Sequence, residues 1–113
     1  MFTKSDLDNF TGTECYHRST FGRLNLTDGV AHLVKNGAAW LVDVIESYQT
    51  GKTQKLPFQV WTIEKIGTKA VITMKEDSDC PVLIKQKIEY TDFPLDTLTI
   101  WVIDGVCLLT SEY

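Results

Sequence analysis

This chain lacks the short motifs that mark most well-characterised active sites. It contains no CxxC pair and no GxxxxGK[ST], GxGxxG, GxSxG or HExxH segment. Nothing in it therefore favours a zinc module, a phosphate-binding loop, a dinucleotide fold, a serine hydrolase or a zinc protease. Its longest apolar run, AAWLV at 38–42, is far too short to cross a bilayer. The opening residues MFTKSDLDNF carry acids rather than an apolar stretch, which argues against a secretory signal.

Cysteine and positive charge are also scarce. The three cysteines, Cys15, Cys80 and Cys107, are an odd number without close spacing, which favours a cytoplasmic protein with reduced thiols. The net charge is −4, and residues 57–113 carry all of the excess, with five lysines against nine acids. The absence of a basic balance argues against duplex DNA as a partner. A mild acidic excess is typical of a cytoplasmic protein or of one whose partner is basic.

The chain does have the composition of a globular protein, and we expect a single domain over 1–113. Apolar residues make up 43% and charged residues 23% of the chain, as in folded rather than disordered proteins. Between 30 and 48 the apolar residues recur with a period of 3.6, which predicts a helix face against a core. Thr27 suits the N-cap position. The Asn36-Gly37 pair leaves open whether 28–49 is one kinked helix or two.

From residue 58 onward the hydrophobic period becomes two, which predicts strands. Alternation runs through 58–63, 70–74, 82–90 and 98–102, and Asp104-Gly105 predicts a hairpin turn before a returning strand at 106–109. We therefore predict an α+β fold, in which N-terminal helices pack on one face of a four- to five-stranded antiparallel meander sheet. The even-numbered strand residues are the more uniformly apolar, so we expect them to face the helices.

The odd-numbered residues form a mixed face that carries Trp61 and Trp101 together with Lys85 and Lys87. Tryptophan is enriched where interfaces carry their binding energy, which makes this face a candidate contact surface. Aromatic residues interleaved with lysines are also typical of platforms for single-stranded nucleic acid. The plainer interpretation is that the tryptophans pack over the lysine stems.

The segment FTGTECYHR, at 10–18, places Cys15 two positions before His17. In an extended segment the two side chains share a face about 6.6 Å apart, beyond the reach of about 2.6–3.2 Å that a nucleophile and its base require. No third residue is identifiable as an orienter, so we expect a small buried thiol beside a hydrogen-bonded imidazole and no catalytic residue. Tyr16, His17 and Arg18 are candidates for contact with a partner, and a small hydrolase using His17 is the weakest alternative.

Three acids, Glu76, Asp77 and Asp79, crowd the loop between two of the expected strands. Such a group could take a hard cation, but the loop lacks the ligand spacing and glycine of an EF-hand. The cysteines and histidines likewise lack the close pairs of a zinc module. We expect no metal and no cofactor, and we interpret the acids as a solvated turn or as a contact for a basic partner.

Five segments occur in this order along the chain: FTGTECYHR, TDGVAHLVKNGAAWLVDVIESYQ, FQVWTI, EYTDFPL and DGVCLLTSEY. Together they resemble an uncharacterised family of small proteins from bacterial, phage and plasmid genomes, with the pattern FTGTE…TDGV…WLxDxI…EYTDFPL…SEY. The resemblance covers nearly the whole chain and assigns no functional residue. It implies a class by association, because small, acidic, motif-free proteins of mobile elements are often inhibitors of host defence, anti-CRISPR proteins among them.

The sequence therefore favours a non-enzymatic binding protein of mobile-element type, an inhibitor of host defence that binds a basic surface of a protein or nucleoprotein target. Its expected contact surfaces are the acidic loop and the open sheet face. The main alternative is a binder of single-stranded nucleic acid or nucleotides that uses the same face. We expect no membrane partner, and the sequence leaves the oligomeric state open.

Overall fold

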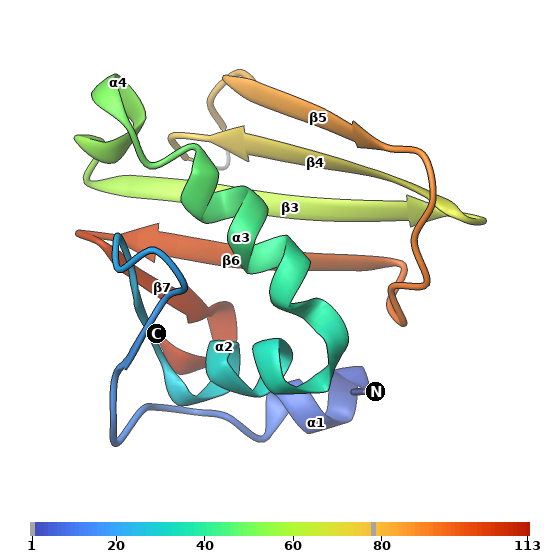
Figure 1. The fold of residues 1–113 in the computed structure, drawn as a ribbon, viewed down its shortest axis with the longest axis horizontal. Coiled ribbons are helices and arrows are strands. Elements are labelled where there is room, and N and C mark those ends of the chain that lie inside the picture. Colours follow the sequence, from blue (N-terminus) through green and yellow to red (C-terminus); the bar gives the residue numbers. More distant parts are fainter. Residues whose placement is uncertain (1, 78) are drawn as a thin grey trace.

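The helices lie over one face of a single mixed β-sheet (Figure 1). This computed structural model describes residues 2–77 and 79–113. The helical elements are α1 (Lys4–Asp8), α2 (Asp28–Leu33), a kinked segment η1 (Val34–Ala38), α3 (Ala39–Ser47), α4 (Gly51–Gln54) and the short 3-10 helix η2 (Thr110–Glu112). The strands are β1 (His17–Arg18), β2 (Asn25–Leu26), β3 (Phe58–Ile66), β4 (Lys69–Lys75), β5 (Ile84–Ile88), β6 (Thr97–Ile103) and β7 (Val106–Leu109). The α+β class predicted from the change of period is confirmed.

The sheet is larger than the sequence predicted, and it is not a simple meander. Its seven strands lie in the order β1-β2-β7-β6-β3-β4-β5, and β2 and β7 run parallel while the other neighbours run antiparallel. The prediction of four or five antiparallel strands is therefore wrong. The reason is local, because β1 and β2 have two residues each and are too short to show an alternating pattern. The parallel pair uses Asn25 and Thr27, whose N–H groups donate to the carbonyls of Gly105 (2.9 Å) and Cys107 (3.1 Å).

The predicted helical region consists of two helices, α2 and α3, joined by a kink. Thr27 caps α2, and its side chain accepts a hydrogen bond from the N–H of Val30. Inside η1, Asn36 (φ −112°, ψ 28°) and Gly37 (φ 101°, ψ 0°) leave the helical conformation. The positive φ of Gly37 is one that residues with a side chain rarely adopt. The chain turns there and continues as α3, so the apolar faces of both helices reach the core.

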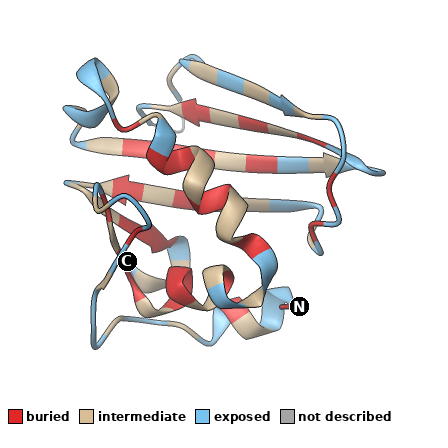
Figure 2. Ribbon diagram, in the orientation of Figure 1, coloured by how far each residue is buried: buried red, intermediate tan, exposed pale blue. Residues whose placement is uncertain are grey.

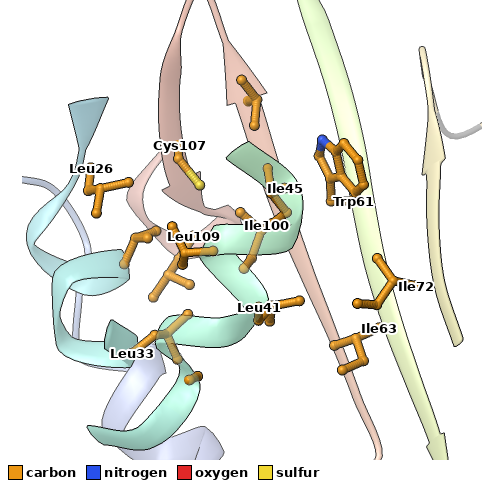
Figure 3. Packing of buried hydrophobic residues seen from close by; sticks show 14 of the residues in the cluster. Leu26, Leu33, Leu41, Ile45, Trp61, Ile63, Ile72, Ile100, Cys107 and Leu109 are labelled. Atoms are coloured by element: carbon orange, nitrogen blue, oxygen red, sulfur yellow. The ribbon is translucent and has the colours of Figure 1, made fainter. Parts of the chain in front are cut away.

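The core lies between the helices and the inner face of the sheet. Buried residues concentrate where α3 crosses the central strands and where α2 lies beside β7 (Figure 2). Leu41 and Ile45 of α3 approach Ile63 and Ile100 of the sheet (Figure 3). At the side of the sheet formed by β2 and β7, a second set of buried hydrophobic residues packs where α2 meets these strands: Leu26, Leu33, Cys107 and Leu109 (Figure 3).

Trp61 belongs to this core and not to the open face. Its side chain is 1% exposed, and its ring centroid lies 5.7 Å from that of Tyr48. The even-numbered residues face the helices in β4, β5 and β6, but in β3 the odd-numbered ones do. The prediction that Trp61 shares the open face with Trp101 is therefore wrong. At the start of β3 both faces are apolar, with Phe58 and Val60 on one and Trp61 on the other, so alternation alone does not fix the phase.

A buried amide network fixes this phase. Gln49 and Gln59 exchange side-chain hydrogen bonds of 2.8 and 3.0 Å, and the indole Nε1 of Trp61 donates to Oε1 of Gln59 at 2.9 Å. The same two amides also donate to the main-chain carbonyls of Ile45 and Thr53. Every N–H of the pair has a partner, which is the condition under which buried polar groups are tolerated. The network joins the end of α3 to β3 and orients the indole toward the helices.

The segment after β7 packs against the start of α2 at Gly29. The Glu112 carboxylate accepts hydrogen bonds from the Thr27 hydroxyl (2.6 Å), the Gly29 N–H (3.1 Å) and the Leu109 N–H (3.0 Å). A Cβ atom on Gly29 would lie 2.6 Å from both Oε1 of Glu112 and Cδ1 of Leu109. A side chain at this position would therefore displace the Glu112 carboxylate or the Leu109 side chain, and the hydrogen bonds of Glu112 oppose that displacement.

We expect Gly29→Ala to lower the free energy of unfolding by about 1–3 kcal/mol, because the added methyl group overpacks this contact. Alanine is otherwise the better helix former, so a loss of stability would be specific to the contact. Gly12→Ala is the matched control, since a Cβ there meets nothing within 4 Å. Urea denaturation of the two variants measures the difference, and equal stabilities would contradict the packing described here.

Candidate functional site

The open face of the sheet carries an aromatic patch, which we define as Phe58, Trp101 and Tyr113. The ring centroids of Phe58 and Trp101 lie 5.4 Å apart at 64°, and those of Trp101 and Tyr113 lie 5.4 Å apart at 81°. These are the edge-to-face arrangements that aromatic pairs prefer. Tyr113 is 82% exposed, while Phe58 and Trp101 are half-buried. The patch therefore presents ordered aromatic edges and faces to solvent.

Strand register explains why these residues meet. Val60 of β3 pairs with Trp101 of β6, and Phe58 pairs with Ile103, so Phe58 and Trp101 are diagonal neighbours on one face. Trp101 in turn pairs with Leu108 of β7. Val60 and Leu108 are only 8% and 7% exposed, so they form an apolar floor on either side of the indole. Trp101 thus lies on the open face, as predicted, and is at the centre of the patch, but its neighbour is Phe58 rather than Trp61.

Lysines occupy the other half of the same face. The register of β3, β4 and β5 places Lys75, Lys85 and Lys87 on the side of the sheet that carries Trp101. Lys85 and Lys87 are exposed and Lys75 is half-exposed. The residues between these lysines and the patch include a row of threonines across three strands: Thr99, Thr62 and Thr73. Sequence analysis identified two of these lysines and missed Lys75, which becomes visible only through the pairing of β3 with β4.

The acidic loop lies at the end of the sheet where the patch begins. Glu76, Asp77 and Asp79 are exposed and follow β4 where it ends beside the start of β3 (Figure 1). Phe58 is the first residue of β3. The β6–β7 turn reaches the same end and exposes Asp104. Negative charge therefore borders the aromatic patch on this side, while positive charge lies along β4 and β5.

The segment before β1 packs against the first residue of α2. The Asp28 carboxylate accepts a hydrogen bond from the Glu14 N–H (3.0 Å), and its Oδ1 lies 3.0 Å from Nε2 of His17. The Asp28 N–H donates to the Thr13 hydroxyl (2.9 Å), which donates to the Cys15 carbonyl (2.7 Å). The hydrogen-bonded imidazole expected from the sequence is present, and Asp28 is the partner that the sequence did not identify. Its position eleven residues away on another element explains why the sequence did not reveal it.

The chemistry of this segment is nevertheless that of a structural junction. The hydrogen bond from the Glu14 main chain and then that with His17 lower the pKa of Asp28, so its carboxylate stays charged. The prediction of a buried Cys15 thiol is wrong, because this side chain is exposed in the segment before β1. No hydrogen bond joins its thiol to His17 within the described residues. Cys107 is fully buried, and burial raises the pKa of its thiol to about 12. A thiol held in its neutral form is a poor nucleophile.

Three other features were sought in the described part of the chain: a metal site, a membrane-spanning helix and a ligand pocket. Among residues 2–77 and 79–113, no three His, Cys, Asp or Glu side chains come together in a way that could hold a metal ion. Within the same ranges, no helix has both the length and the apolar character needed to cross a bilayer. A hollow of about 220 Å³ lies between α1 and the start of β6, lined by residues such as Leu7, Leu95 and Leu98. It is smaller than typical ligand pockets and contains none of the candidate residues.

Comparison with known proteins gives the family of this chain. A model described as "Family of unknown function (DUF6876)" matches residues 1–113. The chain belongs to that family. No curated protein and no solved structure matches it significantly. Membership in DUF6876 agrees with the resemblance to an uncharacterised family and transfers no activity, so the function of this member must be argued from its own surface.

Proposed function

We propose that this protein is a binding protein without catalytic activity, and that it contacts its partner through the open face of the sheet. The observation that carries this proposal is the aromatic patch. Phe58, Trp101 and Tyr113 are ordered by mutual edge-to-face contacts, yet their rings remain accessible. Interface residues that dominate binding energy are aromatic, clustered and surrounded by a polar rim. Threonines, lysines and acids around the patch provide such a rim.

The partner that we propose is a protein or nucleoprotein with a basic surface. Glu76, Asp77, Asp79 and Asp104 lie at the patch end of the sheet, where they would face basic groups on a partner seated over Phe58 and Trp101. Complementary charge at a rim mainly raises the association rate and selects the partner. In a protein of a mobile element, a target of this kind would be a component of host defence. Inhibition of such a component is the biological role that we propose.

Two variants separate the contributions of the patch and of the acids. Trp101→Ala should raise the dissociation rate of the partner about 30-fold, since an aromatic anchor contributes about 2 kcal/mol. Changing Glu76, Asp77 and Asp79 to Lys should slow association at low salt and have little effect at high salt, because the charges are screened beyond ~8 Å at physiological salt. The measurement is comparative affinity capture from host lysate, followed by surface-binding kinetics with the captured partner.

Each variant has a matched control among exposed residues away from the patch. Tyr90→Ala removes an aromatic side chain that is 75% exposed, and changing Asp8, Glu14 and Asp92 to Lys repeats the charge reversal elsewhere. The controls should bind like the wild type. A partner captured equally by wild type and Trp101→Ala would place the interface away from the open face.

A second candidate function is the binding of single-stranded nucleic acid on the same face. The specific observation is that Lys75, Lys85 and Lys87 share this face with Trp101. On platforms that bind single strands, lysines contact the phosphates and aromatic rings stack on the bases. Trp101→Ala together with a further variant, Lys85→Glu, distinguishes the two functions. Salt-dependent binding of a (dT)12 oligonucleotide that is lost in Trp101→Ala and in Lys85→Glu would favour nucleic acid over a basic protein.

A further inference from the structure

The loop between β1 and β2 has an ordered conformation. At its base the Ser19 N–H donates to the Leu24 carbonyl (3.1 Å), and at its tip the Gly22 N–H donates to the Ser19 carbonyl (3.0 Å). Gly22 has a φ of 73°, a left-handed value that suits glycine. The Ser19 hydroxyl also accepts a hydrogen bond from the Leu24 N–H (3.0 Å). These hydrogen bonds close the loop through residues 19–24 alone, without any contact to the helices.

A buried carboxylate from α3 holds the loop in this form. Glu46 is 0% exposed, and its two oxygens accept hydrogen bonds from the Phe21 N–H (3.0 Å), the Arg23 N–H (3.0 Å) and the Ser19 hydroxyl. One turn earlier on α3, Asp43 accepts a hydrogen bond from the Thr20 hydroxyl (3.1 Å). Four of the five positions from 19 to 23 are therefore held by hydrogen bonds to one helix.

A loop that only connected two short strands would not need a buried charged residue to hold it. Burial alone would raise the pKa of Glu46, but the hydrogen bonds from Ser19, Phe21 and Arg23 outweigh it and lower the pKa. The carboxylate is therefore charged at neutral pH. Burying a charge is unfavourable unless its partners are well placed. The partners of the buried Glu46 carboxylate all lie in this surface loop, so the carboxylate stabilises one loop conformation. Pre-ordered loops are typical of binding sites, because they lose less entropy when a partner binds.

The side chains that the loop presents are one aromatic ring and two guanidinium groups. Phe21 is 69% exposed at the tip, and Arg18 and Arg23 are exposed on either side of it in sequence. Arg18 lies along the loop: its Nη1 donates to Oδ1 of Asn25 (3.2 Å), and its Nη2 lies 4.0 Å from the point where a Cβ atom on residue 22 would stand. An exposed phenyl ring beside two arginines has an apolar and a cationic part within a small area.

We propose that the 19–24 loop, with Arg18, is a second docking site, and that its partner is an acidic protein segment. An apolar side chain of the segment would pack on Phe21, and carboxylates on either side would pair with Arg18 and Arg23, whose planar guanidinium groups match carboxylates in geometry. The site is distinct in position from the open sheet face, because its contacts run to α3, which covers the opposite face of the sheet (Figure 1). It does not depend on the function proposed for the aromatic patch.

The test uses a fluorescein-labelled decapeptide of alternating glutamate and leucine, with binding to the full chain measured by fluorescence anisotropy at 50 and 300 mM NaCl. We expect saturable binding that weakens at the higher salt. Reversal of both arginines, Arg18→Glu with Arg23→Glu, should weaken binding at least tenfold, and Phe21→Ala at least fivefold. The double variant Lys52→Glu with Lys55→Glu, which makes the same charge change on α4, should bind within twofold of the wild type, as should Trp101→Ala.

Several results would overturn the proposal. The first is failure of the wild type to bind the peptide up to 1 mM, and the second is equal weakening by the arginine and lysine reversals, which would show a general charge effect. Tighter binding of a (dT)10 oligonucleotide that is lost in the arginine variant would assign the loop to nucleic acid instead. Thermal denaturation of every variant ensures that a loss of binding is not a loss of folding. Amide resonances of 18–24 that do not shift on addition of the peptide would place its binding elsewhere.

Discussion

Replacing Trp61 by alanine is expected to lower the free energy of unfolding by about 3–5 kcal/mol, the usual range for a large aromatic side chain removed from a core. The indole is 1% exposed and packs against Tyr48. Its loss also leaves Oε1 of Gln59 with one hydrogen-bond donor fewer. A domain of this length has a total stability on the order of 5–15 kcal/mol, so the variant should lose a large fraction of its stability. Urea denaturation followed by circular dichroism measures the effect.

Trp101→Ala is the matched control, because it removes the same side chain from the open face. We expect a loss of about 1 kcal/mol, since Trp101 is half-buried and its ring contacts are with the partly accessible Phe58 and the exposed Tyr113. Trp61 should therefore affect stability and Trp101 should affect binding. If the two variants lose equal stability, the assignment of the two tryptophans to opposite faces is incorrect.

Glu46→Ala should be nearly as damaging, with an expected loss of about 3 kcal/mol or more, because buried donors that lose their acceptor carry a full desolvation penalty. The donors concerned are the N–H groups of Phe21 and Arg23 and the hydroxyl of Ser19. The loss should appear in the free energy of unfolding and also as faster amide exchange in 19–24. Exposed Glu64→Ala serves as the control and should change stability little.

The same carboxylate should make stability depend on pH. The pKa of Glu46 in the folded protein lies below its ordinary value of 4.5, so its contribution is fully present above pH 4.5 and is lost as the pH falls from there through the lowered value. The difference in unfolding free energy between wild type and Glu46→Gln should accordingly shrink between pH 6 and pH 3. A difference that stays constant over this range would show that Glu46 is not charged in the folded state.

Hydrophobic periodicity predicted the parts of this fold that are long and regular. The 3.6-residue period located α2 and α3, the two-residue period located the strands after residue 57, and Asp104-Gly105 forms the expected turn with positive φ at both residues, 49° and 80°. Periodicity did not predict β1 and β2, which are too short to have a period. It also assigned Trp61 to the wrong face, because the choice depended on Gln49, a residue on another element that pairs with Gln59.

The candidate site was predictable only where it depends on alternation within a strand. Trp101, Lys85 and Lys87 lie on the open face as expected. Phe58, Lys75 and Tyr113 join them through strand pairing and through the position of the C-terminal residues, neither of which local sequence encodes. The partners of Asp28 and Glu46 likewise lie 11 to 27 positions away in the chain. In the sequence, both acids look like ordinary polar positions of a helix.

The contact between Glu112 and the start of α2 has a consequence for how the protein is made. Thr27 and Glu112 are 85 positions apart, and β2 finds its parallel partner only in β7. When the ribosome has synthesised α1 and α2, it has not yet synthesised β7, which pairs with β2, or Glu112, which binds the start of α2. The N-terminal half should therefore remain incompletely folded on the ribosome, and assembly should wait for residues 107–112 to emerge. Contacts of such long sequence separation are also those that slow folding, so the nascent chain would expose Leu26 and Leu33 to chaperones for most of its synthesis.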